Sequence, residues 1–215
     1  MTTQLEQFLY IPVDDVHIEG MLELPHGAQA IVLFAHGSGS TRHSPQDNFV
    51  ARALREKEIG TLSLDLLTLS EDLDYLTRFD IALLTHRLLV ATRWVKMHYT
   101  TRHLVIGYYG AGSEAAATLQ AAAALGEEVG AVVSRGGRPD LAGSHDLAKV
   151  RSPTLLLVGS LDEEVLELNR EAHAGLHCTK ELTIVAGASH GFGEAGALEE
   201  VARHAGGWFH RYLTI

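Results

Sequence analysis

The residues Leu104-Val-Ile-Gly-Tyr-Tyr-Gly110, followed by Ala111-Gly112-Ser113-Glu114-Ala115-Ala116, decide how this chain folds and what chemistry it can carry. The first part is an apolar run of the kind that forms a buried strand, and the closing alanines favour a helix. Small residues between the two parts allow a sharp turn. A strand, a sharp turn and a helix in this order raise the residue at the turn above the carboxyl end of a sheet, where ligands bind.

Short apolar runs that predict strands recur along the chain. Residues 8–13 and 17–24 predict a hairpin that turns at Asp14-Asp15. Further buried strands are expected at residues 30–35, 61–67, 104–109, 131–134, 154–158 and 182–185.

Segments between these strands predict helices. One long helix has a stripe of apolar residues at three-to-four spacing, and a last helix at 198–212 has another, while residues 115–125 form an alanine-rich helix. The first stripe consists of Phe79, Leu83, Leu84, Leu88, Ala91 and Val95; the last consists of Leu198, Val201, Ala202, Ala205, Trp208 and Phe209. The alternation of strands and helices predicts an α/β fold, with a mostly parallel central sheet of about eight strands and helices on both faces.

An acid and a histidine follow two successive strands late in the chain. Asp162 comes after the strand at 154–158, and His190 comes after the strand at 182–185. With Ser113 earlier in the chain, they give the order serine, aspartate, histidine, which suits a nucleophile, an orienting carboxylate and a general base. Each residue also has a plainer interpretation, because Asp162 could cap the following helix and His190 could be an exposed loop residue.

A glycine-rich turn, Phe34-Ala-His-Gly-Ser-Gly-Ser40, follows the third strand. Its small residues let backbone N–H groups turn toward a developing oxyanion. A turn of this composition taken alone is better explained as a flexible loop. Its place after a buried strand and ahead of the strand–turn–helix segment nevertheless leads us to expect that the N–H groups of Ser38 and Glu114 form an oxyanion hole.

Four segments together resemble the small dienelactone-hydrolase-like α/β-hydrolases: the turn at 36–40, the approach at 107–111, Val133-Ser-Arg-Gly-Gly-Arg-Pro-Asp-Leu141, and Gly187-Ala-Ser-His190. The resemblance spans nearly the whole chain. It implies a capless single α/β-hydrolase domain at 1–215 that acts on a carboxylic ester, lactone or related acyl bond. It also assigns the acid to Asp162 and the base to His190.

The turn departs from this family, and two arrangements compete. Family members with a serine read Gly-Tyr-Phe-Gly-Ala-Ser-Thr-Gly, and without a gap their serine falls on Gly112 and their last glycine on Glu114. In a shifted arrangement Ser113 is the apex, flanked at two residues' distance by Ala111 and Ala115, which are small as the close approach of helix and strand demands. The lengths of the matching segments favour the ungapped arrangement, which we prefer slightly.

Other candidate residues have structural alternatives. Arg135 and Arg138 could hold a substrate carboxylate, or could tie their loop to Asp140 or Asp146. His173 and His177 stand four residues apart, but no third metal ligand accompanies them, so no metal site is expected. The sequence also lacks the glycine-rich motifs of nucleotide binding, and no cofactor is expected.

Composition excludes several classes of partner. The chain has 215 residues, of which 46% are apolar and 20% charged, with a net charge of −10. An acidic balance argues against binding to nucleic acid or to an anionic membrane. The lone Cys178, which is expected in a helical segment, fits a reducing compartment. The N-terminal residues show no signal peptide, so the cytoplasm is the expected location.

Two functions follow from these patterns. The first is an acyl hydrolase in which Ser113 attacks, His190 acts as base and then acid, and Asp162 orients His190. The second is a catalytically silent protein of the same fold that binds a small molecule or partner in the same cleft. The His190–Asp162 pair favours the first function, and Gly112 favours the second.

Overall fold

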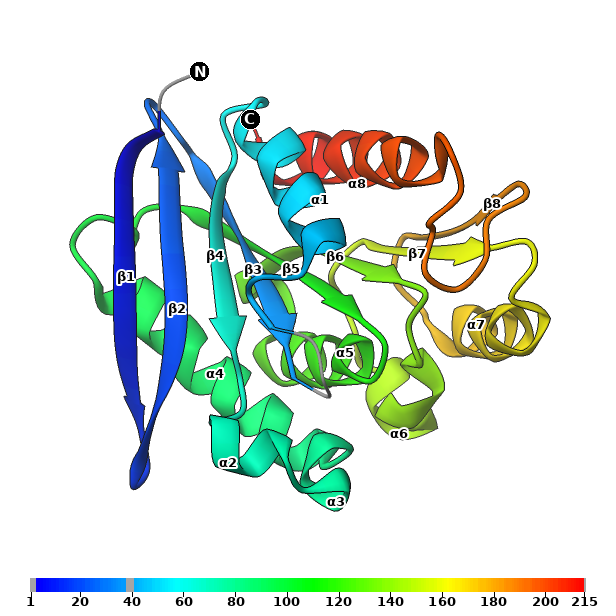
Figure 1. Cartoon of the computed structure of the whole chain (residues 1–215), viewed down its shortest axis with the longest axis horizontal. Coiled ribbons are helices and arrows are strands. Elements are labelled where there is room, and N and C mark those ends of the chain that lie inside the picture. Colours follow the sequence, from blue (N-terminus) through cyan, green and yellow to red (C-terminus); the bar gives the residue numbers. More distant parts are fainter. Residues whose placement is uncertain (1–2, 38–40, 215) are drawn as a thin grey trace.

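A computed structural model describes residues 3–37 and 41–214, and its strands form one eight-stranded sheet (Figure 1). The strands are β1 (Thr3–Val13), β2 (Val16–Pro25), β3 (Ala30–His36), β4 (Gly60–Asp65), β5 (Val105–Ala111), β6 (Val129–Arg135), β7 (Thr154–Gly159) and β8 (Lys180–Val185). Their spatial order is β1-β2-β4-β3-β5-β6-β7-β8. The pairs β1–β2 and β2–β4 are antiparallel and all the others are parallel, which confirms the predicted fold class.

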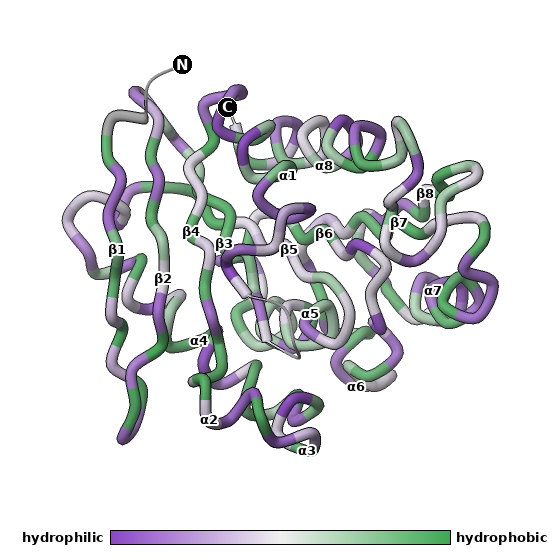
Figure 2. The backbone as a smooth tube through the Cα atoms, viewed as in Figure 1, coloured by the Kyte–Doolittle hydropathy of each residue, from purple (hydrophilic) through white to green (hydrophobic). Residues whose placement is uncertain are grey.

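Helices cover both faces of the sheet (Figure 1). One face carries α1 (Pro45–Arg55) and α8 (Ala197–Leu213). The opposite face carries α4 (Ile81–Met97), α5 (Glu114–Leu125), α6 (Ser144–Leu147) and α7 (Glu163–Gly175), and the short helices α2 (Leu69–Asp72) and α3 (Tyr75–Arg78) precede α4. Hydrophobic and hydrophilic residues alternate along α7 and α8 (Figure 2), as expected for helices that bury one side.

Strand β3 shows how the sheet separates two hydrophobic cores. All seven of its residues are buried. Ile31, Leu33 and Ala35 pack into the core beneath α4 and α5, whereas Ala30, Val32 and Phe34 pack into the core beneath α1 and α8. Because successive strand residues point to opposite faces, a continuous apolar run is what a strand covered on both faces requires.

The chain reverses its direction of travel across the sheet at β3. From β3 it crosses to β4 on one side and then returns, through α4, to β5 on the other side. Ligands of such sheets bind outside the carboxyl ends of the strands at this switch point. The turn after β5 and the turn after β3 therefore lie on opposite sides of the expected site.

Several predicted elements need correction at their edges. Strand β4 ends at Asp65 rather than at residue 67. Phe79, the first residue of the predicted apolar stripe, lies outside α4, because Asp80 caps this helix and the helix begins at Ile81. Phe79 is therefore not part of the buried face and is 48% exposed. Cys178 and His177 lie in the loop after α7, not in a helix. None of the helices within 3–37 and 41–214 has the length and apolar character needed to cross a membrane.

Close packing between β5 and α5 yields a stability prediction. A β-carbon on Gly110 would lie 2.9 Å from backbone atoms of Glu114 and Ala115, which cannot move without opening the turn. Gly110→Ala should therefore lower the free energy of unfolding by about 1–3 kcal/mol, measured by urea denaturation.

Gly207 provides the matched control. It lies in α8, where a β-carbon would meet no atom within 4 Å. Gly207→Ala should raise the free energy of unfolding by about 0.5–1 kcal/mol, because alanine loses less backbone entropy in a helix. An unchanged stability of Gly110→Ala would show that the turn is looser than described.

Candidate functional site

The turn between β5 and α5 has Gly112 at its apex. Gly112 has a φ of +56°, whereas Ser113 has helical backbone angles of −68° and −27° and directly precedes the first residue of α5. A positive φ at a sharp strand-to-helix turn is the backbone of a nucleophile elbow, and it is strained for any residue except glycine. The backbone thus follows the ungapped arrangement of the turn.

Ser113 does not occupy the position that its predicted role as nucleophile requires. Ser113 is only 3% exposed. Its neighbours Ala111, Gly112 and Glu114 line the pocket above the turn, but Ser113 does not. The physical reason is that Ser113 already belongs to the helical geometry of α5, one residue beyond the apex.

Asp162 and His190 meet as predicted. His190 Nδ1 lies 2.7 Å from Asp162 Oδ2, within the expected hydrogen-bonding range. Asp162 stands at the N-cap position of α7, yet its side chain makes no capping hydrogen bond, so its carboxylate is directed to the histidine instead. The Asp162 side chain is 15% exposed and the His190 side chain 63% exposed. A proton on Nδ1 that is donated to Asp162 leaves Nε2 as the basic nitrogen.

A pocket of about 470 Å³ joins the histidine to the turn. It is lined by Thr41, His43, Ser44, Pro45, Gln46, Asp47, Ala111, Gly112, Glu114, Arg135, Gly136, His190 and Gly191. These residues come from the ends of β5 and β6, the loops after β3, β5, β6 and β8, and the first residues of α1 and α5, all at the carboxyl ends of the parallel strands. The position predicted for Ser38 lies outside the described residues, and Arg138 does not line the pocket.

The side chain of Glu114 enters the space between the turn and β3, which the sequence did not indicate. A β-carbon on Gly37 would lie 2.7 Å from Glu114 Oε1, and one on Gly112 would lie 3.4 Å from Glu114 Oε2. Glu114 is only 3% exposed. Only the backbone N–H of Glu114 is expected at the site from the sequence, whereas the carboxylate itself lies there.

A buried network of charged and polar side chains forms one wall of the pocket. Arg135 Nη2 lies 3.1 Å from Asp47 Oδ1, and His36 Nδ1 lies 3.5 Å from Asp47 Oδ2. Burial lowers the pKa of His36 from its usual value, and burial raises the pKa of the Tyr109 phenol, which neighbours Arg135 and Asp47. The Arg135 guanidinium also lies 5.7 Å from the centre of the Phe192 ring, two residues after His190.

The two predicted arginines thus differ in position. Arg135 lines the pocket, but its guanidinium is engaged with Asp47. Arg138 makes two hydrogen bonds to Asp140, of 2.9 and 2.8 Å, which matches the structural alternative for this loop. Asp146 instead lies 3.9 Å from Lys149.

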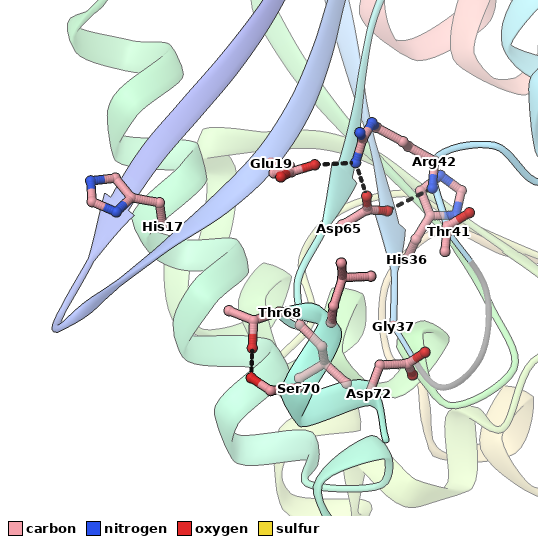
Figure 3. A pocket seen from close by; sticks show the side chains of 12 residues that line it. His17, Glu19, His36, Gly37, Thr41, Arg42, Asp65, Thr68, Ser70 and Asp72 are labelled. Carbon is pink, nitrogen blue, oxygen red and sulfur yellow. Dashed lines mark hydrogen bonds and ion pairs between the residues drawn. The ribbon is translucent and has the colours of Figure 1, made fainter. Parts of the chain in front are cut away.

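A second pocket, of about 530 Å³, adjoins the first at Thr41. Figure 3 shows Arg42 between Glu19 and Asp65 at one end of this pocket and Thr68, Ser70 and Asp72 at the other. Arg42 lies 2.7 Å from Glu19 and also pairs with Asp65, which ends β4. Within the part of the chain that the structure describes, no group of three or more metal-ligating side chains is found.

Several solved structures are similar to this chain over nearly its whole length. No family model matches the chain. A solved structure of a dienelactone hydrolase from Anabaena variabilis is 47% identical, covers 97% of this chain and 98% of its own, and superposes with a TM-score of 0.93. Est1E from Butyrivibrio proteoclasticus, at 14% identity and a TM-score of 0.82, covers 95% of this chain and 98% of its own. A lidless α/β serine hydrolase from Xanthomonas campestris, at 20% identity and a TM-score of 0.79, covers 100% and 98%. These last two show the fold alone.

Curated relatives are longer than this chain. A protein of each of two Mycobacterium tuberculosis strains, named "Putative phosphoribosyl transferase", is 48% identical over 198 residues. The match covers 92% of this chain but only 44% of each relative, so the chain spans less than half of their length.

The network around Asp47 predicts a large effect on stability. Asp47→Ala should leave the buried Arg135 guanidinium without its carboxylate and lower the free energy of unfolding by about 3–5 kcal/mol. Glu167→Ala, which removes the exposed pair with Arg170, should change it by no more than about 1 kcal/mol. Equal effects in chemical denaturation would refute a stabilising role for the Asp47–Arg135 pair.

Proposed function

The chain belongs to the dienelactone-hydrolase-like α/β-hydrolases, and we propose that it hydrolyses carboxylic ester or lactone-type acyl bonds in the pocket above the β5–α5 turn. The observation that carries this proposal is the 2.7 Å contact between His190 Nδ1 and Asp162 Oδ2, with His190 on the wall of that pocket. A protein that only binds a ligand needs no oriented base.

Asp162 and His190 supply the acid–base chemistry. Asp162 accepts the Nδ1 proton and fixes the tautomer, so that Nε2 can take a proton from a nucleophile and later give it to the leaving group. The backbone N–H of Ser113, the residue after the apex, serves as an oxyanion donor. The backbone N–H of Ser38, which lies outside the described residues, is proposed as the second donor.

Gly112 removes the hydroxyl that this family uses for attack. A general base alone contributes about 10²–10⁴-fold to the rate, because it still activates water at the acyl carbon. We therefore propose a slow hydrolase in which no acyl-serine intermediate forms. A small acyl compound is its ligand and the cytoplasm is its location.

A silent binding protein is the second candidate function. The specific observation in its favour is Gly112 at the apex, with a φ of +56° and no side chain to attack. The phosphoribosyl transferase name of the curated relatives adds no third candidate, because this chain matches less than half of each of them.

The base gives the first functional prediction. The wild type should cleave p-nitrophenyl acetate at a low steady rate, and His190→Ala should lose about 10²-fold or more of that rate, since Nε2 is the only base assigned. His204→Ala, a change on α8 at a residue that does not line the pocket, is the matched control and should leave the rate unchanged. Equal rates for wild type and His190→Ala would favour the silent protein.

The turn gives the second functional prediction. A fluorophosphonate probe should leave the wild type unlabelled at Ser113, while Gly112→Ser should become labelled at position 112 and hydrolyse p-nitrophenyl acetate faster. The reason is that one hydroxyl would complete the nucleophile, base and orienting acid, which act as a unit. Labelled peptides would be mapped by mass spectrometry. Probe label on Ser113, or loss of wild-type activity in Ser113→Ala, would establish Ser113 as the nucleophile.

A further inference from the structure

Glu114 combines burial with access to the pocket. Glu114 is only 3% exposed, yet it lines the same 470 Å³ pocket as His190 and Gly112. A carboxylate so deeply buried normally serves a specific contact or a reaction, because removing it from water is costly.

One carboxylate oxygen of Glu114 lies near the position of the missing side chain of residue 112. A β-carbon on Gly112 would lie 3.4 Å from Glu114 Oε2. In a serine at that position the hydroxyl oxygen would extend one covalent bond beyond the β-carbon, and both Gly112 and Glu114 line the pocket. Glu114 Oε2 therefore lies beside the place from which the family's serine attacks.

The other carboxylate oxygen lies against the end of β3. A β-carbon on Gly37 would come within 2.7 Å of Glu114 Oε1, so the carboxylate in this position packs directly against the glycine. Leu84 of α4 borders the same space, at 3.1 Å from that β-carbon position. The carboxylate is thus held between β3 and β5, at the switch point of the sheet.

We propose that the Glu114 carboxylate is the nucleophile of this protein, in place of the serine that Gly112 lacks. This inference rests on the proposed acyl hydrolysis and replaces its direct attack by water with a covalent route. Carboxylates act as nucleophiles in other enzyme classes. Glu114 is also the first residue of α5, where the helix dipole favours a negative charge.

The reaction balances in two steps. Glu114 Oε2 forms a bond to the acyl carbon, and the bond from that carbon to the leaving oxygen breaks, which gives a mixed anhydride and releases the leaving group as an anion. His190 Nε2 then takes a proton from water, and the resulting hydroxide adds to the Glu114 carbonyl carbon of the anhydride, so that the bond from this carbon to the bridging oxygen breaks. Collapse releases the carboxylic acid product and restores the Glu114 carboxylate, and the proton on His190 passes to the leaving group or to solvent.

The first step defines a substrate class. A carboxylate has no proton to hand to His190 when it attacks, so the base cannot become the acid that assists the leaving group, as it does with serine. The leaving group must therefore be stable as an anion. Esters of phenols and similarly acidic alcohols fit this requirement, and esters of simple alkyl alcohols do not.

Oxygen exchange tests the nucleophile directly. The wild type would turn over p-nitrophenyl acetate many times in H₂¹⁸O, and tandem mass spectrometry would then read the tryptic peptide of residues 103–135. Hydroxide that adds to the Glu114 carbonyl of the anhydride leaves ¹⁸O in that side chain, and repeated turnover accumulates it. We expect ¹⁸O at Glu114 and none at Glu127 or Glu128, which are exposed residues of the same peptide.

Two variants complete the test. Glu114→Gln should lower the rate at least about tenfold, since the amide is not a nucleophile. Glu199→Gln, in the first turn of α8 and exposed, should not change the rate. Hydrolysis without ¹⁸O at Glu114, or an unchanged rate in Glu114→Gln, overturns the role of Glu114 and leaves direct attack by water standing. If the wild type hydrolyses nothing and His190→Ala changes nothing, both the nucleophile and the proposed function are wrong.

Discussion

The close approach of β5 to the start of α5 is the constraint on which the site depends. Gly110 leaves no room for a β-carbon beside the backbone of Glu114 and Ala115, so the helix can begin only directly above the strand end. This contact forces the chain through a tight turn, and the positive φ falls on Gly112. It also fixes the start of α5 at the switch point of the sheet, which carries the Glu114 carboxylate toward β3.

A second constraint holds the walls of the pocket together. Asp47 on α1 contacts His36 at the end of β3 and Arg135 at the end of β6, and all three belong to different segments. Arg135 in turn lies against Phe192, close to the histidine loop. Buried ion pairs of this kind contribute little net stability compared with apolar packing, but they are costly to break. Their effect here is to define where the loops of the pocket stand relative to one another.

Fold and chemistry are separable in this protein. The chain shares its fold and nearly half of its residues with a dienelactone hydrolase, yet the residue at the apex of its turn has no side chain. Function depends on the groups in a site and not on the fold that carries them. A histidine that contacts the Asp162 carboxylate and the buried side chain of Glu114 both line this pocket, so its chemistry has to be derived from those groups.

The order of strands and helices and the pairing of Asp162 with His190 can be derived from the amino-acid sequence alone. Buried strands leave continuous apolar runs, and consecutive parallel strands end at one edge, so both features can be recognised from local patterns. Only the tertiary structure decided which residue forms the apex, because the steric preference for small residues around Ser113 competed with the packing of Gly110 against α5. The same holds for the Glu114 carboxylate against Gly37 and for Arg135 with Asp47, 88 residues away. Such contacts join segments that are distant in the chain, so they cannot be predicted from local sequence patterns.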